Sequence, residues 1–172
     1  MFVNLFKHLH TINKHRFLVM KLCFRLGLYW QGLTHDLSKY SFFEFFTSVK
    51  YYTGIKSPID KEIKEKGYSS CWLHHKGRNK HHWQYWTDFY RGEVVYIEMP
   101  LKYIKEMVAD RIAACMVYQK EAYQSDSALK FYLNSKERLF IPPKTSEKLN
   151  YYLTLVAEKP LNEALSIIKN DK

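Results

Sequence analysis

Residues 4–29, NLFKHLHTINKHRFLVMKLCFRLGLY, decide the fold class. Apolar side chains recur in this stretch at steps of three and four residues, which is the period of an α-helix with one buried stripe. The stripe consists of Ile12, His15, Val19, Leu22 and Leu26. We therefore predict one long helix over residues 4–29, with the imidazole of His15 on the face that points into the core.

A second long helix is predicted from Pro100 to about Tyr123, because proline fits the first turn of a helix, where the missing N–H costs nothing. Its buried stripe is Tyr103, Met107, Asp110, Ala114 and Val117. Asp110 is the only carboxylate in that stripe, so its side chain is also expected to point inward.

The rest of the chain carries helix signals as well. Ser41 and Glu44 have the spacing of a capping box, which opens a helix that ends near Gly54 after a break at residues 32–34. The other predicted helices are 59–66, 69–76, 81–90, 127–136, 145–158 and 160–169. No repeat or Gly/Ser linker divides the sequence. We predict a single all-α domain over residues 1–172, with the chemistry at about 10–120 and packing helices at about 127–170.

Composition limits the classes of protein that the chain can belong to. With 172 residues, 47% of them hydrophobic and 26% charged, it is long enough to fold without a disulfide or a structural metal, so a metal would serve chemistry. Lys and Arg number 27 against 17 Asp and Glu, which gives a net charge of +10. This charge favours an anionic partner, such as a phosphorylated small molecule, a nucleic acid or an acidic lipid.

The cysteines and the first 33 residues indicate a cytoplasmic protein. Cys23, Cys71 and Cys115 are odd in number and far apart, which favours reduced thiols. The apolar residues 2–33 are interrupted by basic side chains too often for a membrane span or a signal peptide. A basic amphipathic helix that lies on a membrane is the alternative for this stretch, and burial in the core is favoured over it.

Four histidines form a cluster, and a fifth stands next to an aspartate. His74-His75 and His81-His82 lie within nine residues, and His35 directly precedes Asp36. Imidazole nitrogen and carboxylate oxygen together suit one or two divalent transition-metal ions, namely Mn, Fe, Co, Ni or Zn. The inward His15 and Asp110 would complete the coordination, so we expect a metal centre.

Two other interpretations stay open at this point. Asp110 can form a buried salt bridge with Arg111, Arg78 or Lys39 instead of binding a metal. The paired histidines can stack on tryptophans at the surface, because a helix that would align His74 with His81 has to continue through Gly77.

These residues resemble a known superfamily. His15, the doublet His35-Asp36 and the distant Asp110 are similar to the H…HD…D signature of the HD-domain superfamily, which consists mostly of all-helical, metal-dependent phosphohydrolases. The fuller run HDLSKYSFFEF, HHKGRNKHHWQYW and MVADRIAA is similar to an uncharacterised bacterial and phage family. The resemblance covers about residues 10–120 and implies an HD-like helical bundle.

The resemblance implies roles for individual residues. His15, His35, Asp36 and Asp110 would bind a first metal, and histidines among His74, His75, His81 and His82 would bind a second. The family spaces its extra histidines farther apart, so which of these four are ligands stays open. Lys39 matches the HDxxK pattern, in which the lysine contacts a substrate phosphate.

The stretch around the paired histidines is basic, because no Asp or Glu occurs between Lys66 and Thr87. Arg78 can bind two phosphate oxygens at once, and Asn79 can orient a water or a ligand histidine. Asp36 can bridge two ions or accept a proton from the attacking water. We therefore expect a phosphohydrolase for a small anionic phosphorylated substrate, with nucleotides as the leading class.

Two alternative functions remain. A di-iron oxygenase can use a similar ligand set, and the ligands alone do not separate the two chemistries. A module that binds single-stranded nucleic acid can use the same basic segment, with Trp72, Trp83, Tyr85 and Trp86 stacking on bases.

Overall fold

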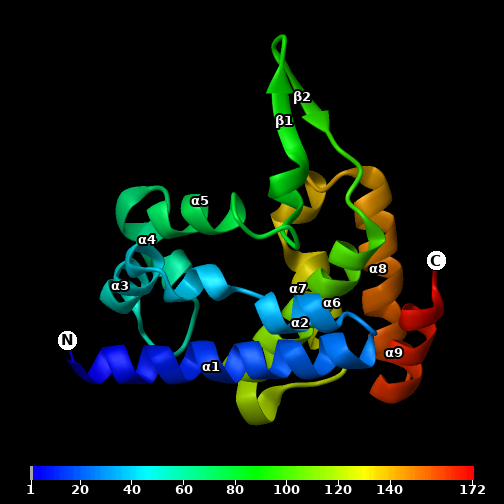
Figure 1. Cartoon of the computed structure of the whole chain (residues 1–172), viewed down its shortest axis with the longest axis horizontal. Helices are drawn as coiled ribbons and strands as arrows, with labels where there is room; N and C mark the ends of the chain where they lie inside the picture. The colour runs from blue at the N-terminus through cyan, green and yellow to red at the C-terminus, as the bar shows by residue number, and fades with distance from the viewer. Residues whose placement is uncertain (1) are drawn as a thin grey trace.

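The computed structural model describes residues 2–172, and it confirms a mostly α-helical single-chain fold (Figure 1). The α-helices are α1 (Phe2–Arg25), α2 (Tyr29–Thr34), α3 (Phe42–Tyr51), α4 (Pro58–Lys66), α5 (Ser70–Lys76), α6 (Leu101–Gln119), α7 (Ser127–Asn134), α8 (Pro143–Glu158) and α9 (Leu161–Asn170). The 3₁₀ turns are η1 (Leu37–Tyr40), η2 (Trp83–Trp86), η3 (Lys120–Ala122) and η4 (Lys136–Leu139). Strands β1 (Thr87–Tyr90) and β2 (Glu93–Tyr96) form the one small sheet among these residues.

The core lies where α1 and α6 pack along each other and α8 and α9 close one end (Figure 1). The stripe predicted for the first helix is buried, and Val19 is inaccessible to solvent. On α6 the side chains of Val108, Ala109 and Ile112 are also inaccessible. Each buried large apolar side chain stabilises the fold by roughly 1.5–3 kcal/mol. Within residues 2–172, no helix is long and apolar enough to cross a membrane.

The first helix ends earlier than the sequence indicates. The predicted helix over 4–29 stops at Arg25, because Gly27 adopts a left-handed backbone (φ 76°), and α2 then begins at Tyr29. Gly32 lies inside α2 rather than at a break. A Cβ atom at Gly32 would lie 3.0 Å from the Phe24 ring and 3.1 Å from Cβ of Cys23, so glycine lets α2 lie directly on α1.

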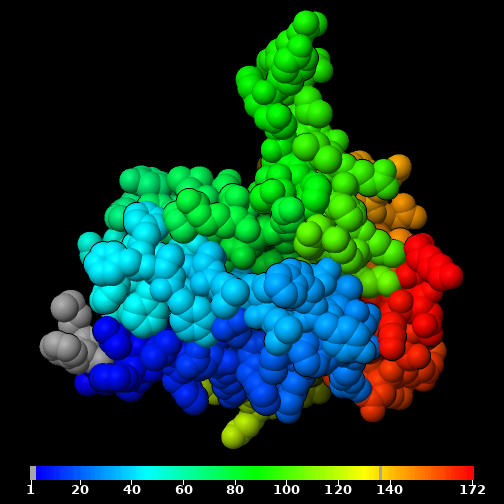
Figure 2. Space-filling view, viewed as in Figure 1, coloured from blue at the N-terminus to red at the C-terminus, as the bar shows by residue number. Residues whose placement is uncertain are grey.

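The helix predicted over residues 81–90 is wrong. The chain instead forms η2 and then a β-hairpin, in which Thr87 pairs with Tyr96 and Tyr90 with Glu93. The two turn residues, Arg91 and Gly92, both have positive φ angles (52° and 86°), as the tight turns of two-residue hairpins require. The aromatic and β-branched residues of this segment favour strand over helix. The hairpin extends away from the helical body (Figures 1 and 2).

The remaining helices lie close to their predicted positions. Ser41 caps α3 as expected, since its Oγ accepts a hydrogen bond from the Glu44 backbone N–H (3.3 Å). Pro100 is the N-cap residue of α6, so it directly precedes the first turn instead of lying in it. The segments after residue 126 form α7, α8 and α9, which pack against the core as predicted.

Candidate metal centre

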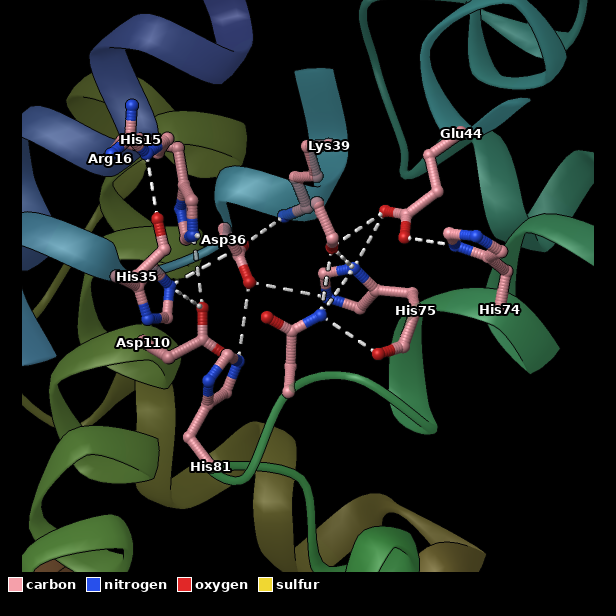
Figure 3. Close-up of polar contacts among 12 residues, drawn as sticks. His15, Arg16, His35, Asp36, Lys39, Glu44, His74, His75, His81 and Asp110 are labelled. Carbon is pink, nitrogen blue, oxygen red and sulfur yellow. Dashed lines mark hydrogen bonds and ion pairs between the residues drawn. The ribbon is translucent and has the colours of Figure 1, made fainter. Parts of the chain in front are cut away.

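Residues from four regions that are far apart in the sequence meet around Asp36 (Figure 3). His15 comes from α1, Asp110 from α6 and His75 from α5, and His35 lies next to Asp36 in the connection between α2 and η1. His81 and His82 come from the loop that follows α5. The long helices α1 and α6 pack along each other, so His15 and Asp110 face each other across the same contact.

The backbone at His35 and Asp36 is held in an unusual conformation. Asp36 has a left-handed backbone (φ 54°), which is uncommon for residues other than glycine and is tolerated best by Asn and Asp. Arg16 fixes the approach to this turn, because its Nε donates to the His35 carbonyl oxygen (2.7 Å) and its Nη2 to that of Leu33 (3.0 Å). Both His35 and Asp36 are buried as a result.

The first group of candidate ligands consists of His15, His35, Asp36 and Asp110. Nε2 of His15 lies 3.0 Å from Oδ1 of Asp110 and 3.7 Å from Oδ2 of Asp36. Nε2 of His35 lies 3.4 Å from the same Asp36 oxygen and 3.6 Å from the same Asp110 oxygen. These are the four residues that the H…HD…D pattern singles out.

The second group consists of Asp36, His75, His81 and His82. Nε2 of His75 and Nε2 of His81 lie 3.3 Å and 3.4 Å from Oδ1 of Asp36. The ring of His82 lies 4.1 Å from that of His81 and 4.9 Å from that of His75, measured between centroids. Asp36 therefore belongs to both groups, with Oδ2 facing the first and Oδ1 facing the second.

Four ligand nitrogens in these groups are buried without a hydrogen bond to any residue of the 2–172 range. They are the Nε2 atoms of His15, His35, His81 and His82. A buried polar atom without a partner costs roughly 1–3 kcal/mol, and native proteins contain few of them. Several such nitrogens beside two carboxylates are the donor set that a divalent transition metal requires, so the residues present fit one or two ions.

Two further carboxylates hold the imidazoles from behind. Glu106 accepts a hydrogen bond from Nδ1 of His35 (2.8 Å), and the same carboxylate oxygen lies 3.2 Å from Nδ1 of His81. Glu44 accepts one from Nδ1 of His75 (2.9 Å). When Nδ1 carries the proton, the lone pair of Nε2 is free to face the centre, which is the usual arrangement around metal-binding histidines.

The buried carboxylates and His35 shift each other's titration. Burial raises the pKa of Asp36, but the charges of His35 and Lys39 outweigh it and hold that pKa well below its usual range. Burial likewise raises the pKa of Asp110, and the close contacts of its carboxylate with the rings of His15 and His35 lower it well below the usual value. Burial lowers the pKa of His35, yet the charge of Asp36 and the contacts with the neighbouring carboxylates raise it well above the ordinary value. Both carboxylates are thus ionised at neutral pH.

Two imidazoles of the centre shift in the other direction. Burial and then the charge of Lys39 lower the pKa of His15. Burial and then the charges of His81 and His75 lower the pKa of His82 well below its usual value. A neutral imidazole is the form that binds a metal, so these two side chains are ready to act as ligands at neutral pH.

Lys39 and Asn79 lie at the centre as the sequence predicts. Nζ of Lys39 is 2.5 Å from Oδ2 of Asp36, and the side chain is 30% exposed. Asn79 is buried and donates hydrogen bonds from Nδ2 to Oγ of Ser38 (2.9 Å) and to the carbonyl oxygen of His75 (2.8 Å). Asn79 thus contacts the backbone of a candidate ligand, His75, and its predicted role of orienting a water or a ligand histidine stays a prediction.

His74 and Arg78 do not lie at the centre. Nδ1 of His74 binds Glu44 (2.6 Å), its ring packs on Phe43, and it belongs to none of the ligand groups in residues 2–172. Arg78 is exposed and donates to the His74 carbonyl oxygen (3.3 Å). Successive residues near the end of α5 point in different directions, so only His75 of the first pair reaches Asp36.

Other expectations about this region also change. Helix α5 ends at Lys76, so the helix does not continue through Gly77, and His81 and His82 reach the centre from a loop instead. The side chain of Arg111 forms an ion pair with Glu137 (3.4 Å) and not with Asp110. The carboxylate of Asp110 faces His15 and His35 instead.

Sequence analysis missed Glu106 and the role of the Glu44 side chain. Glu106 precedes Asp110 by one helical turn, so the two lie on the same side of α6, and this spacing was the available signal. Glu44 was explained as the second half of a capping box. Its carboxylate turns instead to Ser38, His74 and His75.

The fold and the site define a mostly α-helical protein with buried groups of His, Asp and Glu that could hold a metal ion. The chain belongs to DUF5662, a family of unknown function, whose match covers residues 4–155 and so includes every residue of both ligand groups. Neither a curated protein nor a solved structure matches the chain.

Proposed function

We propose that the protein is a metal-dependent phosphohydrolase with an HD-like centre, and that it acts on a small phosphorylated substrate. The observation that carries this proposal is the position of Asp36, whose two carboxylate oxygens each face a different group of imidazole nitrogens. A carboxylate in that position is suited to bridge two ions a few ångströms apart, as in two-metal phosphatases.

The two groups divide the ligands between two sites. His15, His35, Asp36 and Asp110 would hold the first ion, and Asp36, His75, His81 and His82 the second. Divalent ions in these sites would supply a bound water of lowered pKa and a Lewis acid that polarises the phosphoryl oxygens. Glu106 and Glu44 keep three of the imidazoles oriented, so the ligand set is arranged before an ion binds.

Lys39 supports phosphate as the group that binds next to the centre. Burial lowers its pKa, but the charges of Asp36 and Asp110 and the hydrogen bond to Asp36 raise it above the ordinary lysine value, so the ammonium stays charged. The partly exposed side chain contacts Asp36 and would neutralise charge that develops on a phosphoryl oxygen. The net charge of +10 favours multiply charged anions, and nucleotides are the first class to test.

The experiment is a screen for phosphate release. Protein purified without added metal is analysed for its elements and then assayed with nucleotides and general phosphomonoesters and phosphodiesters in Mn²⁺, Co²⁺, Ni²⁺, Zn²⁺ or Fe²⁺. We expect release by the wild type, a loss of at least about 10²-fold in Asp36→Asn because the shared ligand is gone, and nearly full activity in His74→Ala.

The proposal fails if no phosphorylated substrate is turned over by folded, metal-loaded protein, or if Asp36→Asn is as active as the wild type. Bound iron with substrate-dependent oxygen consumption would favour an oxygenase instead. Far-ultraviolet circular dichroism of each variant checks that the helices remain.

A further inference from the structure

The surface formed by α1, α2, η1 and α3 exposes an unusual number of large apolar side chains. Three side chains of α2 stand out, since Tyr29, Trp30 and Leu33 are 60%, 73% and 53% exposed. Six residues define what we call the aromatic face, and they are Phe17, Phe24, Tyr29, Trp30, Leu33 and Leu37. Monomeric proteins rarely leave such a patch open to water unless it binds something.

Contacts link the α1 and α2 parts of the aromatic face. The Phe24 ring lies 5.4 Å from the Tyr29 ring, which joins α1 to α2. Leu33 lies one turn after Trp30, and Arg16 links α1 to the end of α2 through the Leu33 carbonyl oxygen. Figure 2 shows α1, α2 and α3 side by side on one face of the molecule.

The exposed charged side chains of α1–α3 all have one sign. Between residues 3 and 59 the only carboxylates are those of Asp36 and Glu44, and both are buried in the metal centre. The basic side chains of the same stretch include Lys14, Lys21 and Arg25, which are exposed along α1. The surface of α1–α3 therefore presents apolar and positively charged groups and no exposed carboxylate.

A basic side chain also lies against a ring of the aromatic face. Nζ of Lys21 is 4.5 Å from the centre of the Phe17 ring. Long basic side chains in this arrangement can extend to lipid phosphates while their methylene groups cover apolar surface. Trp and Tyr are the residues that favour the boundary between headgroups and acyl chains.

We propose that the aromatic face docks on the surface of an anionic lipid bilayer. Apolar side chains that enter the boundary region, surrounded only by cations, are what peripheral binding to acidic lipid requires. A nucleic acid would use the cations but leaves Leu33, Leu37 and Phe17 without an apolar partner. The proposal stands on the charge and exposure of α1–α3 and is independent of the activity of the metal centre.

Co-sedimentation with lipid vesicles tests the proposal directly on the full chain without added metal. The probes are vesicles that mix phosphatidylglycerol with phosphatidylcholine, and vesicles of phosphatidylcholine alone. We expect the wild type to pellet with the anionic vesicles at low salt, to be released by high salt, and to stay in solution with the neutral ones.

Two double variants remove one part of the face each. Trp30→Ser with Leu33→Ser removes the apolar contact, and Lys14→Glu with Lys21→Glu reverses two charges, so binding should fall about tenfold or more in either case. All four side chains are exposed, so the thermal melting of both variants should stay close to that of the wild type.

Matched controls distinguish binding through the aromatic face from effects of exposed apolar side chains elsewhere and from effects of net charge. Phe89→Ser with Val94→Ser removes equally exposed apolar groups from the hairpin, and Lys102→Glu with Lys130→Glu makes the same change in net charge on α6 and α7. Both should bind anionic vesicles like the wild type.

Three results would overturn the proposal. The first is no binding to anionic vesicles, or equal binding to neutral ones. The second is an equal loss of binding in the controls. The third is a different partner for the face. It would show as a wild-type dimer in solution that Trp30→Ser with Leu33→Ser converts to a monomer, or as binding of single-stranded nucleic acid that the same substitutions abolish.

Discussion

Oε1 of Glu106 accepts a hydrogen bond from Nδ1 of His35 at 2.8 Å, although the two residues are 71 positions apart. The same carboxylate also holds Nδ1 of His81 (3.2 Å). One side chain from α6 thus orients an imidazole of each ligand group. Without the Glu106 carboxylate, the rings of His35 and His81 would be held less firmly with Nε2 directed at Asp36.

The first prediction follows from this contact. Glu106→Gln should weaken metal binding by about 10- to 100-fold, because the amide has one acceptor oxygen and no charge with which to fix both imidazoles. Competition with a metal chelator measures the affinity. Glu98→Gln, at an exposed carboxylate that pairs with Lys144, is the matched control and should bind metal normally. Unchanged affinity in Glu106→Gln would show that the contact does not orient the ligands.

Glu62 allows a second prediction, on stability and pH. Its buried carboxylate accepts hydrogen bonds from Oγ of Ser69 (2.6 Å), Oγ of Ser70 (2.7 Å) and Nζ of Lys66 (3.0 Å). Burial alone would raise the pKa of Glu62, but these hydrogen bonds lower it to about 2. Because the folded pKa lies below the unfolded one, the stabilisation is complete above pH 4.5 and is lost as the pH falls through about 2.

Glu62→Gln should therefore lose roughly 2–3 kcal/mol of unfolding free energy at neutral pH, and its stability should fall less steeply than that of the wild type in acid. Urea unfolding at several pH values measures both quantities. Glu65→Gln, on the exposed side of α4, should behave like the wild type. The same pH dependence in wild type and Glu62→Gln would contradict the assignment.

A third prediction concerns the packing of α2 on α1. Gly32→Ala should destabilise the protein by about 1 kcal/mol or more, since a new Cβ must displace the Phe24 ring and Cys23, and this exceeds the gain in helix propensity. Gly77→Ala is the control, because its nearest neighbour would be 3.5 Å away and its φ of −76° suits alanine. Thermal melting compares the two. Equal or higher stability of Gly32→Ala would contradict close packing at this position.

How far the sequence predicts the molecule depends on the range of the forces involved. The stripe that contains His15, the end of the 59–66 helix and the serine cap of α3 depend on local signals, and they were predicted correctly. The break predicted at Gly32 was wrong, because this glycine lies inside α2 and its role depends on the packing of α2 against α1. The hairpin was missed because its Arg91-Gly92 turn lacks the usual Asn-Gly or Asp-Gly signal.

The candidate site shows the same division. His15 and Asp110 were expected from inward-facing stripes, and the grouping of these two with His35 and Asp36 was what the resemblance to the HD-domain superfamily implied. The choice among the four clustered histidines could not be predicted, because it depends on where α5 ends and how the loop after it returns to Asp36. The capping-box pattern predicted that the Glu44 carboxylate bonds to the N-terminus of its own helix. In the structure it accepts hydrogen bonds from His74 and His75 instead.

The central claim is that Asp36 joins two metal sites. Its most direct test is the metal content per chain, measured by plasma mass spectrometry after equilibration with Mn²⁺ or Zn²⁺ and removal of the free ion. We predict two ions in the wild type and in His74→Ala, one in His82→Ala, and a loss of both from folded Asp36→Asn. A folded wild type without bound metal, or an Asp36→Asn variant that retains both ions, would contradict the claim.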